Sequence, residues 1–223
     1  KYPINDTYVY LSNFWISDCY FYLGEYKKSI IGYSNLPNSR ADNLSYYVDL
    51  KNYNIAYSYF QVGDYLNALK WFRYFEKLTS DSMKVNDTYL RIADSYFMNN
   101  DFVLSSKYYN KAIELDLFDT DYALYQNAVS LGLIGKDVSK AELLKKIVSD
   151  FNNSSYFDDA LYDLAKYYKN RLNYDVAIKY FEDLISYTTD ENMIADAYLS
   201  KGMIYFNSGK VDIAVNEFLY ILN

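Results

Sequence analysis

The chain of 223 residues contains no histidine and a single cysteine, Cys19. The missing histidine removes the most common general base, the most common metal ligand and every nucleophile that a histidine activates. One cysteine excludes an intrachain disulfide, and a zinc site would need more thiolate or imidazole ligands. Gly132 and Gly135 lack the Gly-Lys-Ser/Thr ending of a phosphate-binding loop. The sequence therefore predicts a protein that is not an enzyme and binds no cofactor or metal ion.

Proline, glycine and positive charge are also scarce. Two prolines and seven glycines indicate short turns and no long linkers. Lysine and arginine total 22 against 29 acidic residues, a formal charge of −7. This balance argues against binding to the nucleic acid backbone or to an anionic membrane surface. No stretch is long and apolar enough to insert into a membrane. Basic or neutral partners remain open.

Aromatic residues make up 20% of the chain, and they follow a repeating pattern. A large residue, a small residue nine positions later and a large residue four positions further on recur six times. Successive copies lie 39, 37, 35, 37 and 37 residues apart. The copies are Tyr20–Ser29–Tyr33, Tyr59–Ala68–Phe72, Tyr96–Ser105–Tyr109, Leu131–Lys140–Leu144, Tyr168–Ala177–Phe181 and Tyr205–Ala214–Phe218.

Turn-forming residues stand at a fixed place in this pattern. Four residues after the first member comes a glycine or asparagine in five of the six copies, and Leu172 takes the place in the fifth. A left-handed residue there lets one helix stop and the next begin. The pattern predicts an all-α chain with helices over residues 6–22, 26–35, 43–61, 65–78, 86–98, 102–115, 120–133, 138–150, 156–170, 174–186, 191–207 and 211–222. Asp87 and Asp121 are expected to open two of these helices.

The segment Asn54 to Leu69 resembles the consensus of the tetratricopeptide repeat family, and the six copies stay in phase with it. The resemblance implies an α-α superhelix of about six helix-turn-helix repeats, forming one solenoid over residues 1–223. The repeats would span residues 6–39, 43–82, 86–118, 120–153, 156–188 and 191–222. The chain departs from the family in three ways: its repeats exceed the usual 34 residues, the late proline is missing, and Lys140 fills a slot for a small residue.

In this family the first helix of each pair lines a concave groove, which implies positions for partner contacts. They fall six before, two before and one after the first member of each triplet. The implied groove is aromatic and acidic, and Tyr57 and Tyr125 are expected to be exposed in it. The predicted partner-binding residues are Phe14, Asp18, Phe21, Tyr53, Tyr57, Phe60, Leu90, Asp94, Phe97, Tyr125 and Tyr162.

The function that these features favour is a scaffold for protein–protein interaction, which binds a partner peptide or protein in this groove. The alternative is a receptor module for a glycan or small ligand, because tyrosine rings stack on sugars. An adaptor for chaperone C-termini is disfavoured. Its carboxylate clamp needs Lys, Asn, Asn, Lys and Arg, and the corresponding residues are Phe14, Asp18, Asn54, Asp87 and Arg91.

Two further features concern the setting of the chain. Ser149 to Tyr162 resembles a junction found in tetratricopeptide proteins of the bacterial envelope, namely the barrel-assembly lipoprotein and the Tol–Pal cell-division coordinator. That resemblance implies a periplasmic or outer-membrane-associated protein. The chain starts at Lys1, and its last helix ends with Phe218, Leu219, Ile221 and Leu222. We therefore expect a segment of a longer protein, with further repeats or self-association through the last helix.

Overall fold

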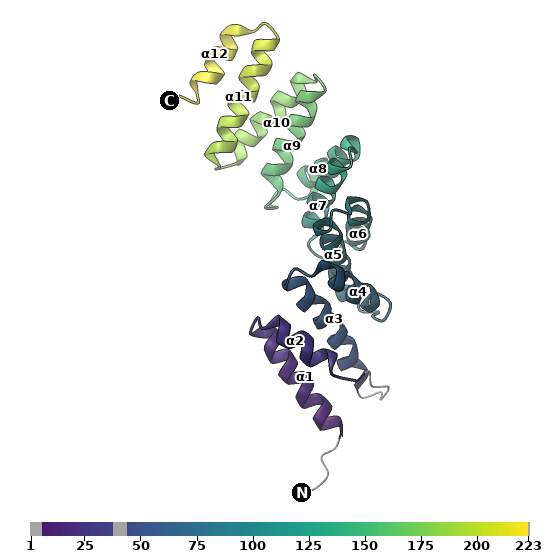
Figure 1. Cartoon of the computed structure of the whole chain (residues 1–223). Helices are drawn as coiled ribbons and strands as arrows, with labels where there is room; N and C mark the ends of the chain where they lie inside the picture. Colours follow the sequence, from purple (N-terminus) through teal and green to yellow (C-terminus); the bar gives the residue numbers. More distant parts are fainter. Residues whose placement is uncertain (1–5, 38–43, 223) are drawn as a thin grey trace. The chain divides into compact units, whose positions relative to one another are not determined.

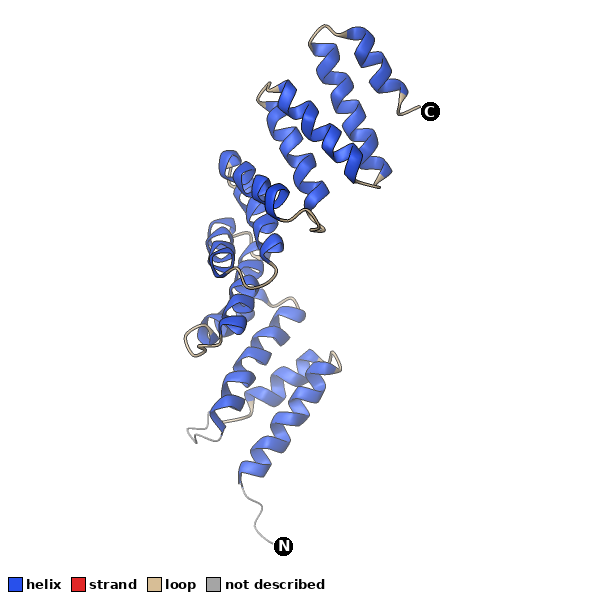
Figure 2. Cartoon of the chain, turned by 180° about the vertical axis from the view of Figure 1, so that it is seen from behind, coloured by secondary structure: helices blue, strands red, loops and turns tan. Residues whose placement is uncertain are grey.

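The computed structural model describes residues 6–37 and 44–222, which form helices joined by short turns (Figure 1). In these residues no strand is present, which confirms the all-α prediction (Figure 2). Residues 39 and 43, at two predicted repeat boundaries, lie outside the described part. The helices are α1 Asp6–Tyr22, α2 Tyr26–Ser34, α3 Ser45–Gln61, α4 Tyr65–Phe75, α5 Ser82–Met98, α6 Phe102–Leu115, α7 Thr120–Leu133, α8 Asp137–Asp150, α9 Phe157–Asn170, α10 Tyr174–Tyr187, α11 Glu191–Asn207 and α12 Val211–Leu219.

The contacts between helices divide the chain into two compact units, residues 1–118 and residues 119–223. Unit 1 holds α1 to α6 and unit 2 holds α7 to α12. Within each unit, helices pair as hairpins, and each second helix also packs on the first helix of the next hairpin. This is the arrangement that a bare apolar face on each hairpin requires. One solenoid running through both units stays a prediction.

The hairpin turns confirm the expected backbone geometry. Gly24, Gly63, Gly135 and Gly209 have φ between 74° and 78°. Asn100 and Leu172 take the same left-handed conformation, with φ of 60° and 59°. In the turn at Gly63 the Asp64 amide donates to the Tyr59 carbonyl at 2.9 Å, which closes the end of α3. The left-handed conformation is strained for Leu172, whereas a glycine would adopt it without strain. The Leu172 side chain is 71% exposed.

The core follows the triplets. The third members Tyr33, Phe72, Tyr109, Leu144 and Phe181 are buried. Small residues let the paired helices approach, as expected for Ala56 and Ala68, which are fully buried. At Gly202 a Cβ atom would overlap the Phe218 ring, so any larger residue would require that ring to move.

Helix starts differ from the prediction where the N-terminal cap differs. The helix expected from residue 86 begins at Ser82, because the Asp81 carboxylate accepts from the amides of Met83 and Lys84 at 3.0 and 3.3 Å. Asp87 is therefore not the residue that opens it. The helix predicted over residues 120–133 has those bounds, and Asp121 lies in its first turn rather than at its N-terminal cap. Helices α4 and α12 each end three residues before the predicted position.

Lys140 occupies the small-residue slot of the fourth repeat because Gly132 makes room for it. Lys140 Cδ lies 3.1 Å from the place where a Cβ on Gly132 would stand. The ammonium continues to Asp163 on α9, with Nζ 2.6 Å from the carboxylate. The lysine stem thus covers the helix backbone while its charge is paired at the next hairpin.

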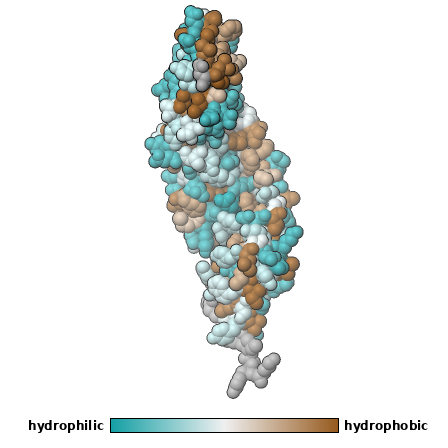
Figure 3. Space-filling model, turned by 90° about the vertical axis from the view of Figure 1, so that its left-hand side faces the viewer, coloured by the Kyte–Doolittle hydropathy of each residue, from teal (hydrophilic) through white to brown (hydrophobic). Residues whose placement is uncertain are grey.

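The last helix leaves its apolar face open in the single chain. Leu219 is 46% exposed and Leu222, just after the helix, is 80% exposed. Hydrophobic side chains gather at this C-terminal end in the space-filling view (Figure 3). Further repeats or self-association through this face stay predictions. None of the described helices has the length and apolar character that crossing a membrane requires.

Candidate partner-binding site

The predicted contact residues fall into two groups by burial. Phe14 and Leu90 are fully buried, so the prediction that they face a groove is wrong. Phe14 packs against Tyr33 on α2 and Tyr47 on α3, with ring centroids 5.4 and 5.1 Å apart. Its position, six before the first member of the triplet, points into the core. The aromatic and tyrosine positions Phe21, Tyr53, Tyr57, Phe60, Phe97, Tyr125 and Tyr162 are half-buried.

Asp18 is also buried, and it binds groups of the protein itself. Its Oδ1 accepts from the Tyr33 hydroxyl at 2.7 Å and from Asn54 Nδ2 at 2.9 Å. Asn54 Nδ2 also donates to the Tyr33 oxygen at 2.8 Å. Burial, together with the neighbouring Asp18, raises the pKa of the Tyr33 phenol above its usual value. A buried carboxylate needs such donors, so Asp18 stabilises unit 1 and is withdrawn from contact with a partner.

Asp94 repeats this arrangement two hairpins later. It is buried, and it accepts from the Tyr109 hydroxyl at 2.6 Å and from Arg91. The sequence carried a signal for both pairs. Aspartate stands two before the first member only in the two repeats whose third member is tyrosine. The expected acidic groove positions at Asp18 and Asp94 are therefore corrected: they are internal acid–phenol pairs.

Tyr53 and Tyr57 on α3 converge on Asp87 of α5. The Asp87 carboxylate accepts from Tyr53 at 2.6 Å and from Tyr57 at 2.7 and 2.8 Å. Arg91, one turn further along α5, lies 3.4 Å from the same carboxylate. Burial first, and Asp87 next, raise the pKa of both phenols. Tyr57 is therefore half-buried and bonded, and the expectation of an exposed ring is wrong.

Phe21, Phe60 and Phe97 share a structural contact that the sequence interpretation missed. Each packs edge-on against the aromatic residue five positions later, which opens the second helix of the same hairpin. The centroid distances are 5.7 Å for Phe21–Tyr26, 5.4 Å for Phe60–Tyr65 and 5.3 Å for Phe97–Phe102. These rings close the hairpin turns and remain partly exposed to a ligand.

In unit 2 the first helices carry tyrosine beside carboxylates. Tyr125 of α7 stacks on Tyr156, with centroids 4.9 Å apart and planes at 16°. Asp158 and Asp159 follow in the first turn of α9. Burial, then Asp158 and Asp163, raise the pKa of the Asp159 carboxyl. Tyr125 is half-buried by this stack, so the expectation that its ring is exposed is wrong as well.

Tyr162, one turn into α9, continues this surface. Its hydroxyl donates to Asp196 of α11 at 3.0 Å. Lys166 lies over the same ring, with Nζ 4.9 Å from the centroid. A cation thus already sits on a tyrosine face next to a carboxylate, which shows the kind of contact that this surface makes.

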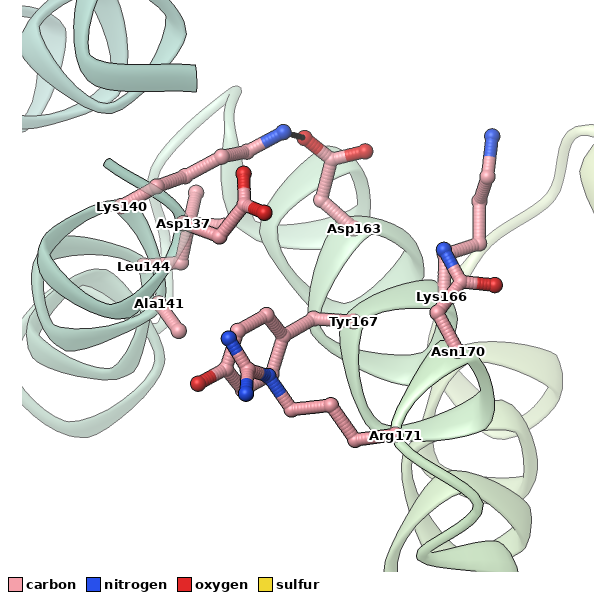
Figure 4. Close-up of a pocket in the computed structure, with 9 residues that line it drawn as sticks. All are labelled: Asp137, Lys140, Ala141, Leu144, Asp163, Lys166, Tyr167, Asn170 and Arg171. Carbon is pink, nitrogen blue, oxygen red and sulfur yellow. Dashed lines mark ion pairs between the residues drawn. The ribbon is translucent and has the colours of Figure 1, made fainter. Parts of the chain in front are cut away.

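Helices α8 and α9 also enclose a cavity of about 470 Å³ (Figure 4). Lys140 reaches across from α8 to Asp163, and the Tyr167 ring points from α9 toward α8 with Arg171 beside it. The Arg171 guanidinium lies 4.5 Å from the Tyr167 centroid. None of the eleven predicted contact residues lines this cavity. In the described ranges no cluster of three or more acidic or cysteine side chains could hold a metal ion.

Comparison with known proteins identifies the repeat. Two family models, each described as tetratricopeptide repeat, match residues 87–119 and 159–187. No curated protein matches the chain. The resemblance of Ser149 to Tyr162 to envelope proteins is tested by none of these comparisons and stays a prediction.

Solved structures share the fold. The crystal structure of MamA is 22% identical, covers 75% of this chain and 92% of its own, and has a TM-score of 0.62. A tetratricopeptide repeat protein from Parabacteroides merdae is 17% identical, with 96% and 78% coverage and a TM-score of 0.64. YrrB, titled a protein with an unusual peptide-binding site, is 16% identical, with 78% and 86% coverage and a TM-score of 0.60.

Proposed function

Because the chain is built of tetratricopeptide repeats, we propose that it is a scaffold that holds a partner protein or peptide on the first-helix faces of its hairpins. The half-buried residues Phe21, Phe60, Phe97, Tyr125 and Tyr162 supply the aromatic part of this surface. Amphipathic rings held in place by their neighbours bind at a low cost in conformational entropy. Asp18, Phe14, Leu90 and Asp94 are excluded from the proposed contact because they are buried.

The observation that carries the proposal is the Tyr125–Tyr156 stack beside Asp159. No lysine or arginine of the described chain lies within 4.0 Å of the Asp159 carboxylate. Burial first, and then repulsion by Asp158 and Asp163, raise the pKa of this carboxyl, so its ionised form is disfavoured. Unit 2 contains ten basic and sixteen acidic residues, a formal charge of −6. A lysine or arginine of the partner would lie on the ring faces and relieve the repulsion.

The glycan-receptor alternative depends on tyrosine rings that are free to stack on a sugar. Tyr53 and Tyr57 are bonded to Asp87 and pack on each other, with centroids 4.9 Å apart. Tyr125 is covered on one face by Tyr156. No contact in the described chain favours a sugar over a cationic peptide, so the proposal remains with a protein partner.

The test is binding of a fluorescein-labelled peptide of alternating lysine and leucine, measured by fluorescence polarisation. Asp158→Asn/Asp159→Asn should weaken binding by about 2- to 30-fold, the effect of two half-exposed ion pairs of about 0.2–1 kcal/mol each. The matched variant Asp183→Asn/Asp212→Asn changes two exposed acids on second helices and should bind like the unaltered chain. Equal affinity of all three proteins, or no binding of the basic peptide, would refute the proposed surface.

A further inference from the structure

Helix α4 and the turn after it carry three positive charges that no carboxylate of the described residues pairs with. Lys70 and Arg73 are exposed on this helix, and Lys77 is exposed in the turn that follows its last residue, Phe75. No carboxylate in the described residues lies within ion-pair distance of any of the three. Glu76, the acid at the end of the same helix, is bound instead by Lys111 at 2.8 Å and by the Tyr108 hydroxyl at 3.3 Å. The Arg73 guanidinium donates to the Tyr96 hydroxyl at 3.4 Å, which is a neutral partner. Like charges spaced three or four residues apart repel one another, so cations without a carboxylate partner carry a cost in stability.

Two aromatic rings lie among these cations. Trp71 is half-buried, because its inner side packs on the core of unit 1, and Tyr74 is 45% exposed. Their rings meet edge to face at 89°, with centroids 6.2 Å apart. Together with the three cations they line a surface hollow of about 600 Å³. We call these five residues the α4 patch: Lys70, Trp71, Arg73, Tyr74 and Lys77.

The α4 patch combines two kinds of recognition in one place. The perpendicular rings form an apolar corner that suits an aromatic or aliphatic side chain. The cations on both sides of it suit carboxylates, and Arg73 can hold one in a bidentate manner. Because α4 is the second helix of its hairpin (Figure 1), the patch is separate from the first-helix faces of the proposed function.

We propose that the α4 patch is a docking site for a short acidic peptide segment of a partner protein, with an aromatic or large apolar side chain between its carboxylates. The length of the patch supports a short segment. Lys70 and Arg73 lie three residues apart on α4, about 4.5 Å along its axis, and Lys77 stands two residues after the helix ends, so a few residues of an extended peptide cover the patch.

The charge of the chain selects this occupant over longer polyanions. A nucleic acid strand or an anionic membrane would extend beyond the patch and meet a chain with a formal charge of −7. A short peptide contacts only the cations, because salt screens charges beyond about 8 Å. The proposal goes beyond the first-helix surface, and its test uses different residues and a peptide of opposite charge.

The experiment measures fluorescence polarisation of a labelled Asp-Glu-Phe-Asp-Glu peptide with the whole chain at about 0.15 M salt. Saturable binding is expected, with at least tenfold lower affinity for Lys70→Glu/Arg73→Glu/Lys77→Glu. The matched variant Lys107→Glu/Lys136→Glu/Lys179→Glu has the same net charge and should keep its affinity within twofold. Circular dichroism shows whether each variant is folded. If the Lys70→Glu/Arg73→Glu/Lys77→Glu variant unfolds, glutamine is placed at the same three positions instead and the affinity is measured again.

The peptide and the aromatic corner are tested separately. Replacing the peptide phenylalanine by alanine, or Tyr74 by serine, should each lower affinity about fivefold, and the two changes together should lower it no further. Absence of saturable binding, or equal loss in both charge-reversal variants, would overturn the proposal. Tighter binding of oligothymidylate or of phosphatidylserine vesicles through the same three cations would overturn the choice of occupant.

Discussion

The buried pair of Asp18 and Tyr33 gives the sharpest test of how this surface is built. If Asp18 were a partner contact, its replacement would leave stability nearly unchanged. The structure instead gives its Oδ1 two donors, Tyr33 at 2.7 Å and Asn54 at 2.9 Å. Asp18→Val removes this acceptor and leaves the buried Tyr33 hydroxyl without a hydrogen-bond partner for its proton. We expect unit 1 to lose about 2–4 kcal/mol of unfolding free energy.

The partner substitution allows the interaction itself to be isolated. Tyr33→Phe alone leaves the carboxylate with only the Asn54 donor and should cost about 1–3 kcal/mol. The double variant imitates the other repeats, where an apolar third member accompanies a residue other than aspartate. It should cost less than the sum of the two single changes by about 1.5–3 kcal/mol, the range for a hydrogen bond to a charged group.

Urea unfolding followed by tryptophan fluorescence is the suitable assay, since both tryptophans, Trp15 and Trp71, lie in unit 1. Linear extrapolation for the four proteins of the cycle gives the coupling energy. A coupling below about 0.5 kcal/mol, the usual limit for independent sites, would refute the acid–phenol explanation. So would an Asp18→Val variant as stable as the unaltered chain.

Three further predictions concern unit 2. Leu172→Asn should raise the unfolding free energy by about 0.5–1 kcal/mol, because asparagine tolerates the left-handed conformation better than leucine does. Leu172→Ala should give no gain, and urea unfolding followed by circular dichroism measures both variants. The pKa of Asp159 is higher in the folded state than in the unfolded state, so at pH values above the folded-state pKa the ionised carboxylate destabilises the fold. At pH values below the pKa of the unfolded state, near 3.9, the carboxyl is protonated in both the folded and the unfolded chain and the destabilisation is absent. Asp159→Asn should therefore raise the melting temperature at pH 7, with a difference that disappears by about pH 3; a constant difference would contradict this. Leu219→Glu/Leu222→Glu should abolish any concentration-dependent association seen by light scattering, and unchanged association would exclude the last helix as its surface.

The helices could be predicted from the sequence because their signals are local. A small residue at Ala56 and Ala68 and a turn former at Gly63 are each set by one hairpin, and the phase of the six copies corrects single exceptions such as Leu172. The start and end points of the helices follow less closely from the repeat pattern. The Asp81 cap lies outside the repeated triplet, so the pattern alone placed the start of α5 four residues late.

The candidate site was predicted less well, because burial depends on side chains from neighbouring hairpins. Residues of α2 and α3 bury Phe14, and Asp87 accepts hydrogen bonds from tyrosine hydroxyls of α3. The positional rule treats each first helix alone and so cannot show these contacts. The correlation of Asp18 with Tyr33 was present in the sequence and could have been found by comparing positions within a repeat. The Tyr125–Tyr156 stack had no comparable signal, since Tyr156 stands outside the triplets.

The acid–phenol pairs have a consequence for how such a gene can be rearranged. In each pair the aspartate lies on the first helix of a hairpin and the tyrosine on the second, 15 residues later. A crossover inside the hairpin with a copy whose third member is phenylalanine or leucine would bury Asp18 or Asp94 without its phenol. A crossover in the loop between hairpins keeps both members together. Recombination junctions among these repeats should therefore lie between hairpins, because a unit that is duplicated or deleted there still contains both members of the pair.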